Sequence, residues 1–139
     1  MKQYNIIYAD PPWKYQGGQN MRGSPSKHYP VMPLDEICAL PVSKFAAENC
    51  ALFLWVTFPK LEECFDVIKA WGFTYRTVAF TWIKQTKKSG KWFMGLGWWT
   101  RNNAEICLLA TKGKPKRVSA CVRPCQYQAV LHEQLSSNH

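Results

Sequence analysis

Up to residue 111, the chain contains four short apolar segments and one segment whose apolar residues recur at helical spacing. The segments 5–9 and 51–56 are runs of β-branched, aromatic and other apolar residues, and each predicts a buried strand. Residues 73–83 alternate and are rich in Thr, Phe, Tyr and Val, which predicts a third strand. A fourth strand is predicted at 105–111. The first of these strands is stopped by two prolines at positions 11 and 12.

Between the second and third strands, apolar residues recur at helical spacing. They are Leu61, Cys64, Phe65, Ile68 and Trp71. Pro59 suits the first helical position and Gly72 suits a helix C-cap. Shorter helical turns are predicted at 33–37 and 42–46. The order strand, helix, strand predicts an α/β fold, with a mostly parallel sheet and flanking helices.

The segments without periodicity are expected to be loops. Residues 14–33 contain three glycines and three prolines, and a loop of this length inside a compact domain is usually functional. Residues 84–99 form a basic loop that carries glycines and tryptophans. Lys84, Lys87, Lys88 and Lys91, with Trp92, Trp98 and Trp99, offer charge for phosphates and flat surfaces for bases. The alternative is a solvated lysine loop whose tryptophans fold inward.

Charge and composition narrow the choice of partner and compartment. The 139 residues suffice for one domain, and their net charge of +9 favours a polyanionic partner, of which nucleic acid is the commonest. A basic protein without such a partner is the alternative. No signal peptide, metal-binding cysteine pair or membrane-spanning apolar run is evident, so we expect a reduced, cytoplasmic protein that neither binds a metal nor enters a membrane.

The tetrapeptide Asp10-Pro11-Pro12-Trp13 directly follows the first predicted strand, where open α/β sheets bind their ligands. An exocyclic amine of a base is a poor nucleophile, because its lone pair is delocalised into the ring. Acceptors on Asp10 and on the Pro11 carbonyl would hold both N–H groups and leave the lone pair free. Pro12 keeps the preceding residue extended, and Trp13 offers a face to an unstacked base. In the alternative interpretation, Asp10 ends a strand and Trp13 is a core aromatic.

Several blocks in order resemble the MT-A70-like family of adenine-N6 methyltransferases, especially its bacterial and phage members. They are Asp10-Pro11-Pro12-Trp13, Lys27-His28-Tyr29-Pro30, Leu52-Phe53-Leu54-Trp55-Val56-Thr57, Trp71-Gly72-Phe73-Thr74-Tyr75, Trp82-Ile83-Lys84 and residues 97–113 with Arg101-Asn102-Asn103-Ala104-Glu105. The resemblance implies a partial Rossmann-like fold that uses S-adenosylmethionine to methylate adenine. The substrate would be nucleic acid, with DNA favoured over RNA by the brevity of the chain.

The resemblance also assigns residues. Asp10 and Pro11 would orient the target amine, and Pro12 and Trp13 would shape the base pocket. Further substrate-binding residues would be Lys27, His28, Tyr29, Lys84, Arg101, Asn103 and Glu105. Asp10, Pro11 and Lys84 would also lie beside the cofactor. Lys84 is equally well explained as a solvated strand end, and His28 as a surface residue.

The resemblance is incomplete toward the C-terminus. It covers residues 4–117, which indicates an incomplete catalytic domain at 1–117 and a divergent, poorly ordered tail at 118–139. Much of the family's cofactor pocket would follow in sequence, and no GxGxxG loop is present. Three hypotheses stay open: an adenine methyltransferase, a catalytically silent nucleic-acid-binding subunit that forms a homo- or heterodimer, and another base-modifying enzyme on the same scaffold.

Overall fold

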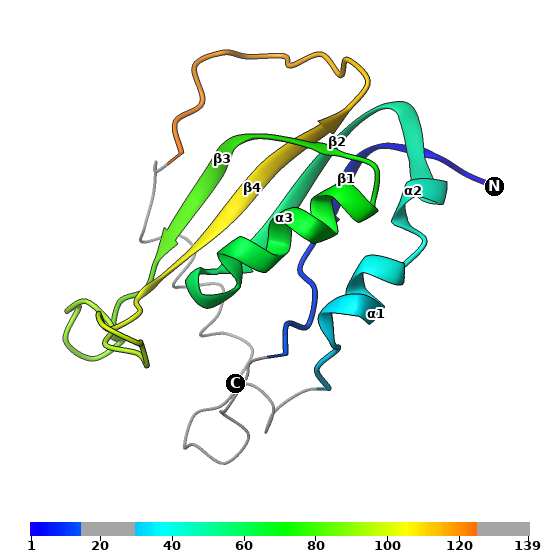
Figure 1. Cartoon of the computed structure of the whole chain (residues 1–139). Helices are drawn as coiled ribbons and strands as arrows, with labels where there is room; N and C mark the ends of the chain where they lie inside the picture. Colours follow the sequence, from blue (N-terminus) through cyan, green and yellow to red (C-terminus); the bar gives the residue numbers. More distant parts are fainter. Residues whose placement is uncertain (15–29, 125–139) are drawn as a thin grey trace.

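A computed structural model describes residues 1–14 and 30–124 (Figure 1). Four strands form one sheet: β1 (Tyr4–Ala9), β2 (Ala46–Thr57), β3 (Thr74–Ile83) and β4 (Ala104–Lys112). The helices are α1 (Leu34–Ala39), α2 (Val42–Phe45), the 3-10 turn η2 (Phe58–Lys60) and α3 (Leu61–Ala70). All four predicted strands are therefore present, and the periodic segment after the second one is a helix.

The sheet is mixed, with the strand order β1-β2-β4-β3. β1 pairs with β2 in parallel, whereas β4 is antiparallel to both of its neighbours, β2 and β3. The expectation of a mostly parallel sheet is therefore wrong. The connection from β3 to β4, residues 84–103, contains no crossover helix. A chain that returns without a crossover forms an antiparallel pair.

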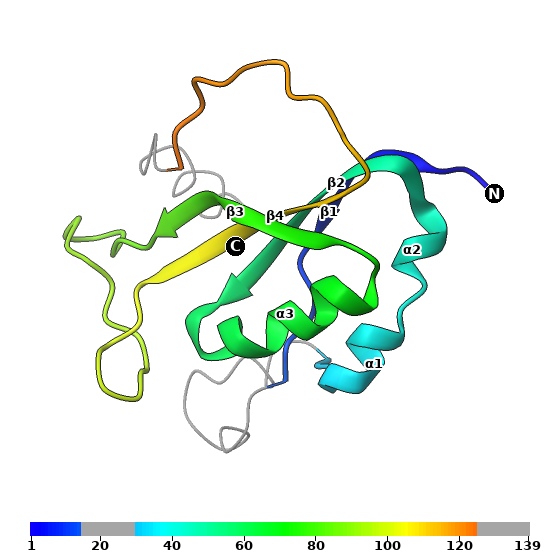
Figure 2. The same ribbon diagram turned by 45° about the horizontal axis from the view of Figure 1, so that its top comes forward.

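One face of the sheet carries the hydrophobic core. Alternate residues of β2 are buried on this face, as a strand's period of two requires, and α3 packs over them (Figures 1 and 2). The buried residues of β2 and β4 on this face include Cys50, Leu52, Leu54, Val56, Ile106, Leu108 and Ala110. α3 contributes Cys64, Val67 and Ile68 from its apolar side. This packing holds the sheet, and with it the strand ends that carry the site residues, in place.

The ends of α3 follow local chemistry. Pro59 lies in the 3-10 turn, so the α-helix begins two residues later than Pro59 alone indicates. Gly72 has a φ of 83°, the left-handed conformation of a helix C-cap, as predicted. Trp71, directly before Gly72, is buried. Its Nε1 donates a hydrogen bond to the Ile37 carbonyl oxygen at 2.9 Å, which connects the end of α3 to α1.

The first strand is less buried than its sequence indicates. Ile6 and Tyr8 are 65% and 68% exposed, because they alternate with the core-packed Ile7 and Ala9 and so lie on the other face of this edge strand. The apolar run had predicted a buried strand, which is typical of a central position in a parallel sheet. In the described part of the chain, nothing covers this edge. No helix there is long and apolar enough to cross a bilayer.

Candidate active site

The sheet topology brings four of the predicted site residues to one edge. β1, β2 and β3 run in the same direction and end at this edge, while the antiparallel β4 begins there. Asp10 follows β1, Lys84 follows β3, and Asn103 and Glu105 flank the first residue of β4. In the register, Glu105 is opposite Thr57 on β2. Residues far apart in sequence therefore meet at a single sheet edge, where α/β proteins place their ligands.

Asp10 is an anion in an unfavourable setting. Its side chain is accessible to solvent, yet the protein around it removes part of its hydration and raises the pKa of its carboxyl above the ordinary value. The negative charge of Glu105 raises the pKa further. Asp10 in turn contributes to a raised pKa of the Cys107 thiol, about 12, for which burial is the main cause. These effects place Asp10, Glu105 and Cys107 close together.

Lys84 and Glu105 form an ion pair across β3 and β4. Lys84 Nζ lies 2.8 Å from Glu105 Oε1, and both side chains are partly buried. The same ammonium lies 4.9 Å from the ring centroid of Trp82, within range of a cation–π interaction. Lys84 lies directly after the end of β3, partly exposed, and its charge is engaged by Glu105. The pair fixes the position of one carboxylate beside Asp10.

The segment after β1 is hydrogen-bonded to the residues just before α1. Trp13 N–H donates to the Pro11 carbonyl oxygen at 2.9 Å, and Met32 N–H donates to the Pro12 carbonyl oxygen at 2.8 Å. The Pro11 carbonyl was expected to be free for a base amine, and it already accepts one hydrogen bond. A carbonyl oxygen has two lone pairs, so one acceptor position remains.

Trp13 lies in the core. Its side chain is 5% exposed, and Nε1 donates to the Trp55 carbonyl oxygen at 3.1 Å. The expectation that Trp13 presents an open face to a base does not hold in this structure. The competing interpretation, a core aromatic, describes it correctly. Because the indole is held by β2, it anchors the two prolines and Asp10 at the end of β1.

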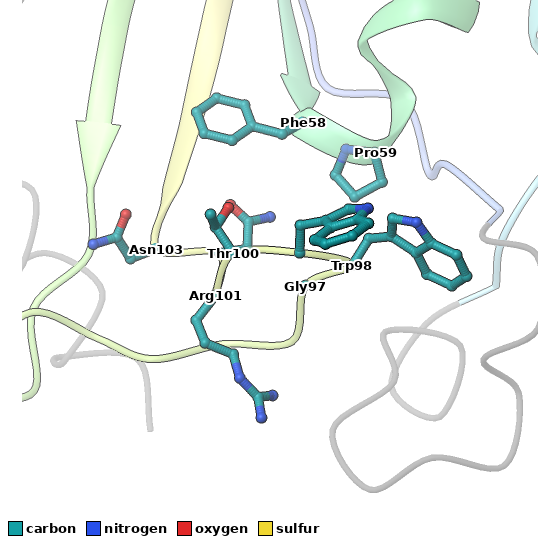
Figure 3. Close-up of a pocket in the computed structure, with 9 residues that line it drawn as sticks. Phe58, Pro59, Gly97, Trp98, Thr100, Arg101 and Asn103 are labelled. Carbon is teal, nitrogen blue, oxygen red and sulfur yellow. The ribbon is translucent and has the colours of Figure 1, made fainter.

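A cavity of about 410 Å³ opens beside this edge (Figure 3). Phe58 and Pro59, which directly follow β2, form one wall, and the 97–103 loop before β4 forms the other. Arg101 and Asn103 line this cavity, as the resemblance implied for the substrate site. In Figure 3 the Arg101 guanidinium points away from Phe58. The volume falls in the range of small-molecule pockets.

Phe58, Pro59 and Cys107 were not anticipated as neighbours of the site. They carry no motif. Phe58 and Pro59 reach it because β2 pairs with β4, so that the residues after Thr57 lie next to those before Glu105. This pairing is a property of the tertiary fold. The signal available in sequence was the pair of prolines that ends the first strand and, by analogy, Pro59 after the second.

The remaining predicted residues divide in two groups. Lys27, His28 and Tyr29 lie outside the described residues. Lys87, Lys88 and Lys91 are exposed on the 84–93 segment, which folds back on itself: Gln85 bridges Trp92, and Thr86 N–H donates to the Lys91 carbonyl oxygen at 2.8 Å. The exposed lysines are available to a polyanion from this side of the site.

The partly desolvated carboxylate of Asp10 is compatible with a nearby positive charge, such as the sulfonium of S-adenosylmethionine. Lys84, expected beside the cofactor, has its ammonium paired with Glu105. Asp10 and Pro11, also expected beside the cofactor, directly follow β1 at the same sheet edge, and Pro11 is buried.

Comparisons with known proteins show that the sequence is similar to those of methyltransferases. The sequence profile of the MT-A70 family matches residues 4–138, and so extends past residue 117, where the sequence resemblance had ended. The type II methyltransferase M.MunI of Mycoplasma sp is 33% identical over 130 residues, which is 81% of this chain and 53% of that protein.

Two animal proteins are also similar. The N(6)-adenosine-methyltransferase MT-A70-like protein of Drosophila melanogaster is 28% identical over 122 residues, covering 84% of this chain and 18% of that protein. The N(6)-adenine-specific methyltransferase METTL4 of Homo sapiens is 38% identical over 56 residues, covering 40% of this chain and 11% of that protein. The chain thus spans about half the length of M.MunI and less than a fifth of these two relatives.

Proposed function

The chain belongs to the MT-A70 family, and we propose that it transfers a methyl group from S-adenosylmethionine to the exocyclic amine of adenine in nucleic acid. DNA is the favoured substrate. The observation that carries the proposal is the meeting of Asp10, Lys84 and Glu105 at the sheet edge, directly after the strand that ends in two prolines. The net charge of +9 supports a polyanionic substrate.

In this mechanism the chain mainly orients the amine. Asp10 accepts one N–H of the adenine amine, and the remaining lone pair of the Pro11 carbonyl oxygen accepts the other. The nitrogen lone pair is then directed out of the ring plane toward the methyl group, and holding it there accounts for most of the rate gain. When bound, S-adenosylmethionine supplies the activated methyl group. Trp13 acts as a positioning residue, since its hydrogen bond to Trp55 holds the segment in place.

The raised pKa of Asp10 suits its part in this reaction. After the new N–C bond has formed, the amine nitrogen must lose one proton. A carboxylate whose pKa is raised by burial and by Glu105 accepts a proton more readily than an ordinary aspartate. Lys84 Nζ lies 2.8 Å from Glu105 Oε1, so this ion pair holds the Glu105 carboxylate in place beside Asp10.

The test is methyl transfer by the full chain from radiolabelled S-adenosylmethionine to an adenine-containing DNA oligonucleotide. Asp10→Asn should reduce incorporation by about 100-fold or more, because one of the two acceptors becomes an amide that can present its donor group. Asp35→Asn, which changes an exposed aspartate on α1, is the matched control and should retain activity. Equal activity of the two variants would refute the role of Asp10.

A second candidate function is a nucleic-acid-binding subunit that acts in a homo- or heterodimer. The exposed β1 edge favours it, since Ile6 and Tyr8 lie on an edge strand whose outer side is unpaired among the described residues, and proteins normally cover such an edge. Calorimetric titration of the folded chain with S-adenosylmethionine separates the two. Binding supports the stand-alone enzyme. Absence of binding, with oligonucleotide binding retained, supports the subunit.

A further inference from the structure

Two neighbouring tryptophans beside the cavity are almost fully exposed. Trp98 and Trp99 are 95% and 92% exposed, whereas Trp13 and Trp71 are buried in the core. Indole rings carry large apolar surfaces, and leaving two of them in water forgoes a substantial hydrophobic gain. A pair of exposed indoles therefore marks a binding surface better than a packing role.

The loop that presents them is closed by its own backbone. Gly95 N–H donates to the Asn102 carbonyl oxygen at 2.8 Å, and Asn102 N–H donates to the Leu96 carbonyl oxygen at 3.3 Å. A Cβ at Gly97 would lie 1.8 Å from the Thr100 carbonyl oxygen. Gly95 and Gly97 therefore allow a close approach of the backbone within the loop. The two indoles are thus held at the tip of a closed loop.

The loop faces a wall that comes from β2. Phe58 and Pro59 line the cavity opposite the 97–103 loop (Figure 3). Together with the tryptophans they give the cavity an aromatic and apolar lining. Arg101 also lines the cavity, and its guanidinium points away from Phe58. Stacking surfaces combined with a cation are the elements with which proteins hold single-stranded nucleic acid.

The cavity lies at the same sheet edge as Asp10. Glu105, whose charge acts on Asp10, is opposite Thr57, and the cavity begins with the next residue, Phe58. Phe58 and Pro59 belong to the 3-10 turn η2, which leaves the sheet directly after β2. A base bound in the cavity would therefore be a neighbour of a base bound at Asp10.

We propose that this cavity holds the unpaired base next to the target adenine, stacked on Trp98 or Trp99, while Arg101 contacts the adjoining phosphate. This assignment rests on the proposed function and adds to it: the substrate is presented as an unpaired strand at two successive nucleotides. The target amine is held at Asp10 and its neighbour between Phe58 and the tryptophans.

The experiment measures binding alone, without the cofactor. The probe is a fluorescein-labelled single-stranded DNA oligonucleotide with one adenine among thymines, followed by fluorescence anisotropy with the full chain. Two further oligonucleotides carry an abasic site directly 5′ or 3′ of the adenine. The test variant is a double variant that combines Trp98→Ala with Trp99→Ala. The matched control is Trp92→Ala, which changes an exposed tryptophan outside the cavity. Circular dichroism confirms that each variant is folded.

For the unsubstituted protein, one of the two abasic sites should weaken binding about 5- to 100-fold, the range measured for loss of one base–aromatic stack. The double variant should bind the intact oligonucleotide more weakly by a similar factor. Its affinity for the oligonucleotide with that abasic site should be no lower than its affinity for the intact one. Trp92→Ala should keep the full abasic effect.

The assignment would be overturned if the affinity losses caused by the double variant and by the abasic site multiply when the two are combined. It would also be overturned if neither abasic site weakens binding, or if the protein does not bind the intact oligonucleotide. The cavity would then be left to a protein partner. The methyl-transfer assay keeps the two proposals apart. Activity without coupling between the tryptophans and the abasic site removes this inference alone, and coupling without activity removes the enzyme proposal alone.

Discussion

Replacing Trp13 with alanine tests whether this residue is a core anchor or a stacking surface. The side chain is 5% exposed and its Nε1 donates to the Trp55 carbonyl oxygen at 3.1 Å. Truncating a buried tryptophan removes its transfer free energy and leaves a cavity, which together cost about 3–5 kcal/mol. Small domains have a free energy of unfolding of about 5–15 kcal/mol, so the loss is a large fraction of the total.

The assay is urea unfolding followed by far-ultraviolet circular dichroism, which does not depend on tryptophan emission. With a denaturant slope of about 2 kcal/mol per molar, the midpoint of Trp13→Ala should fall by about 1.5–2.5 M. Trp13→Phe keeps most of the packing and loses the hydrogen bond, so it should cost about 1–3 kcal/mol.

Trp98→Ala is the control, because its side chain is 95% exposed and contributes little to the core. Its free energy of unfolding should change by about 0.5 kcal/mol or less. If Trp13→Ala and Trp98→Ala unfold at the same urea concentration, the placement of Trp13 in the core is refuted. The stacking interpretation of this residue would then return.

Three other measurements test the structure. Asp10→Asn should stabilise the fold near neutral pH, because the raised pKa means that the ionised carboxyl destabilises the folded state; the gain should vanish as the pH falls below the ordinary value of 3.8 in urea titrations. Gly72→Ala should lower the free energy of unfolding by about 1–2 kcal/mol in the same assay, since Gly72 has a φ of 83°. Iodoacetamide at about pH 8 should modify exposed Cys121 in the folded protein and spare Cys64 and Cys107, whose pKa values are raised to about 12, as peptide mass spectrometry would show.

The sequence pattern was sufficient for the elements and insufficient for their pairing. Each strand and α3 is visible in the hydrophobic period of its own segment, and Gly72 marks the end of α3 locally. Strand direction depends on the connections. The 84–103 segment has neither helical periodicity nor a helix, and a parallel return would have needed a crossover. The expectation of a mostly parallel sheet did not take this missing crossover into account.

The candidate site, like the fold, was predictable where it depends on local sequence and not where it depends on tertiary contacts. Asp10 follows from its place after a strand, which is local information. The fate of Trp13 depends on a carbonyl oxygen 42 residues away on β2, so an open and a buried ring are equally compatible with the tetrapeptide. The cavity depends on the approach of Phe58 to the 97–103 loop, and no motif encodes a contact made by two loops.

The antiparallel direction of β4 is what assembles the site. β4 is 9 residues long, and Glu105 is its second residue. If β4 ran parallel to β2, Glu105 would lie near the opposite edge of the sheet, roughly 20 Å away at about 3.3 Å per residue. It would then have no effect on the pKa of Asp10 and no contact with Lys84, both of which the structure shows. The feature of the fold that the sequence pattern missed is therefore the one that brings Glu105 to Asp10.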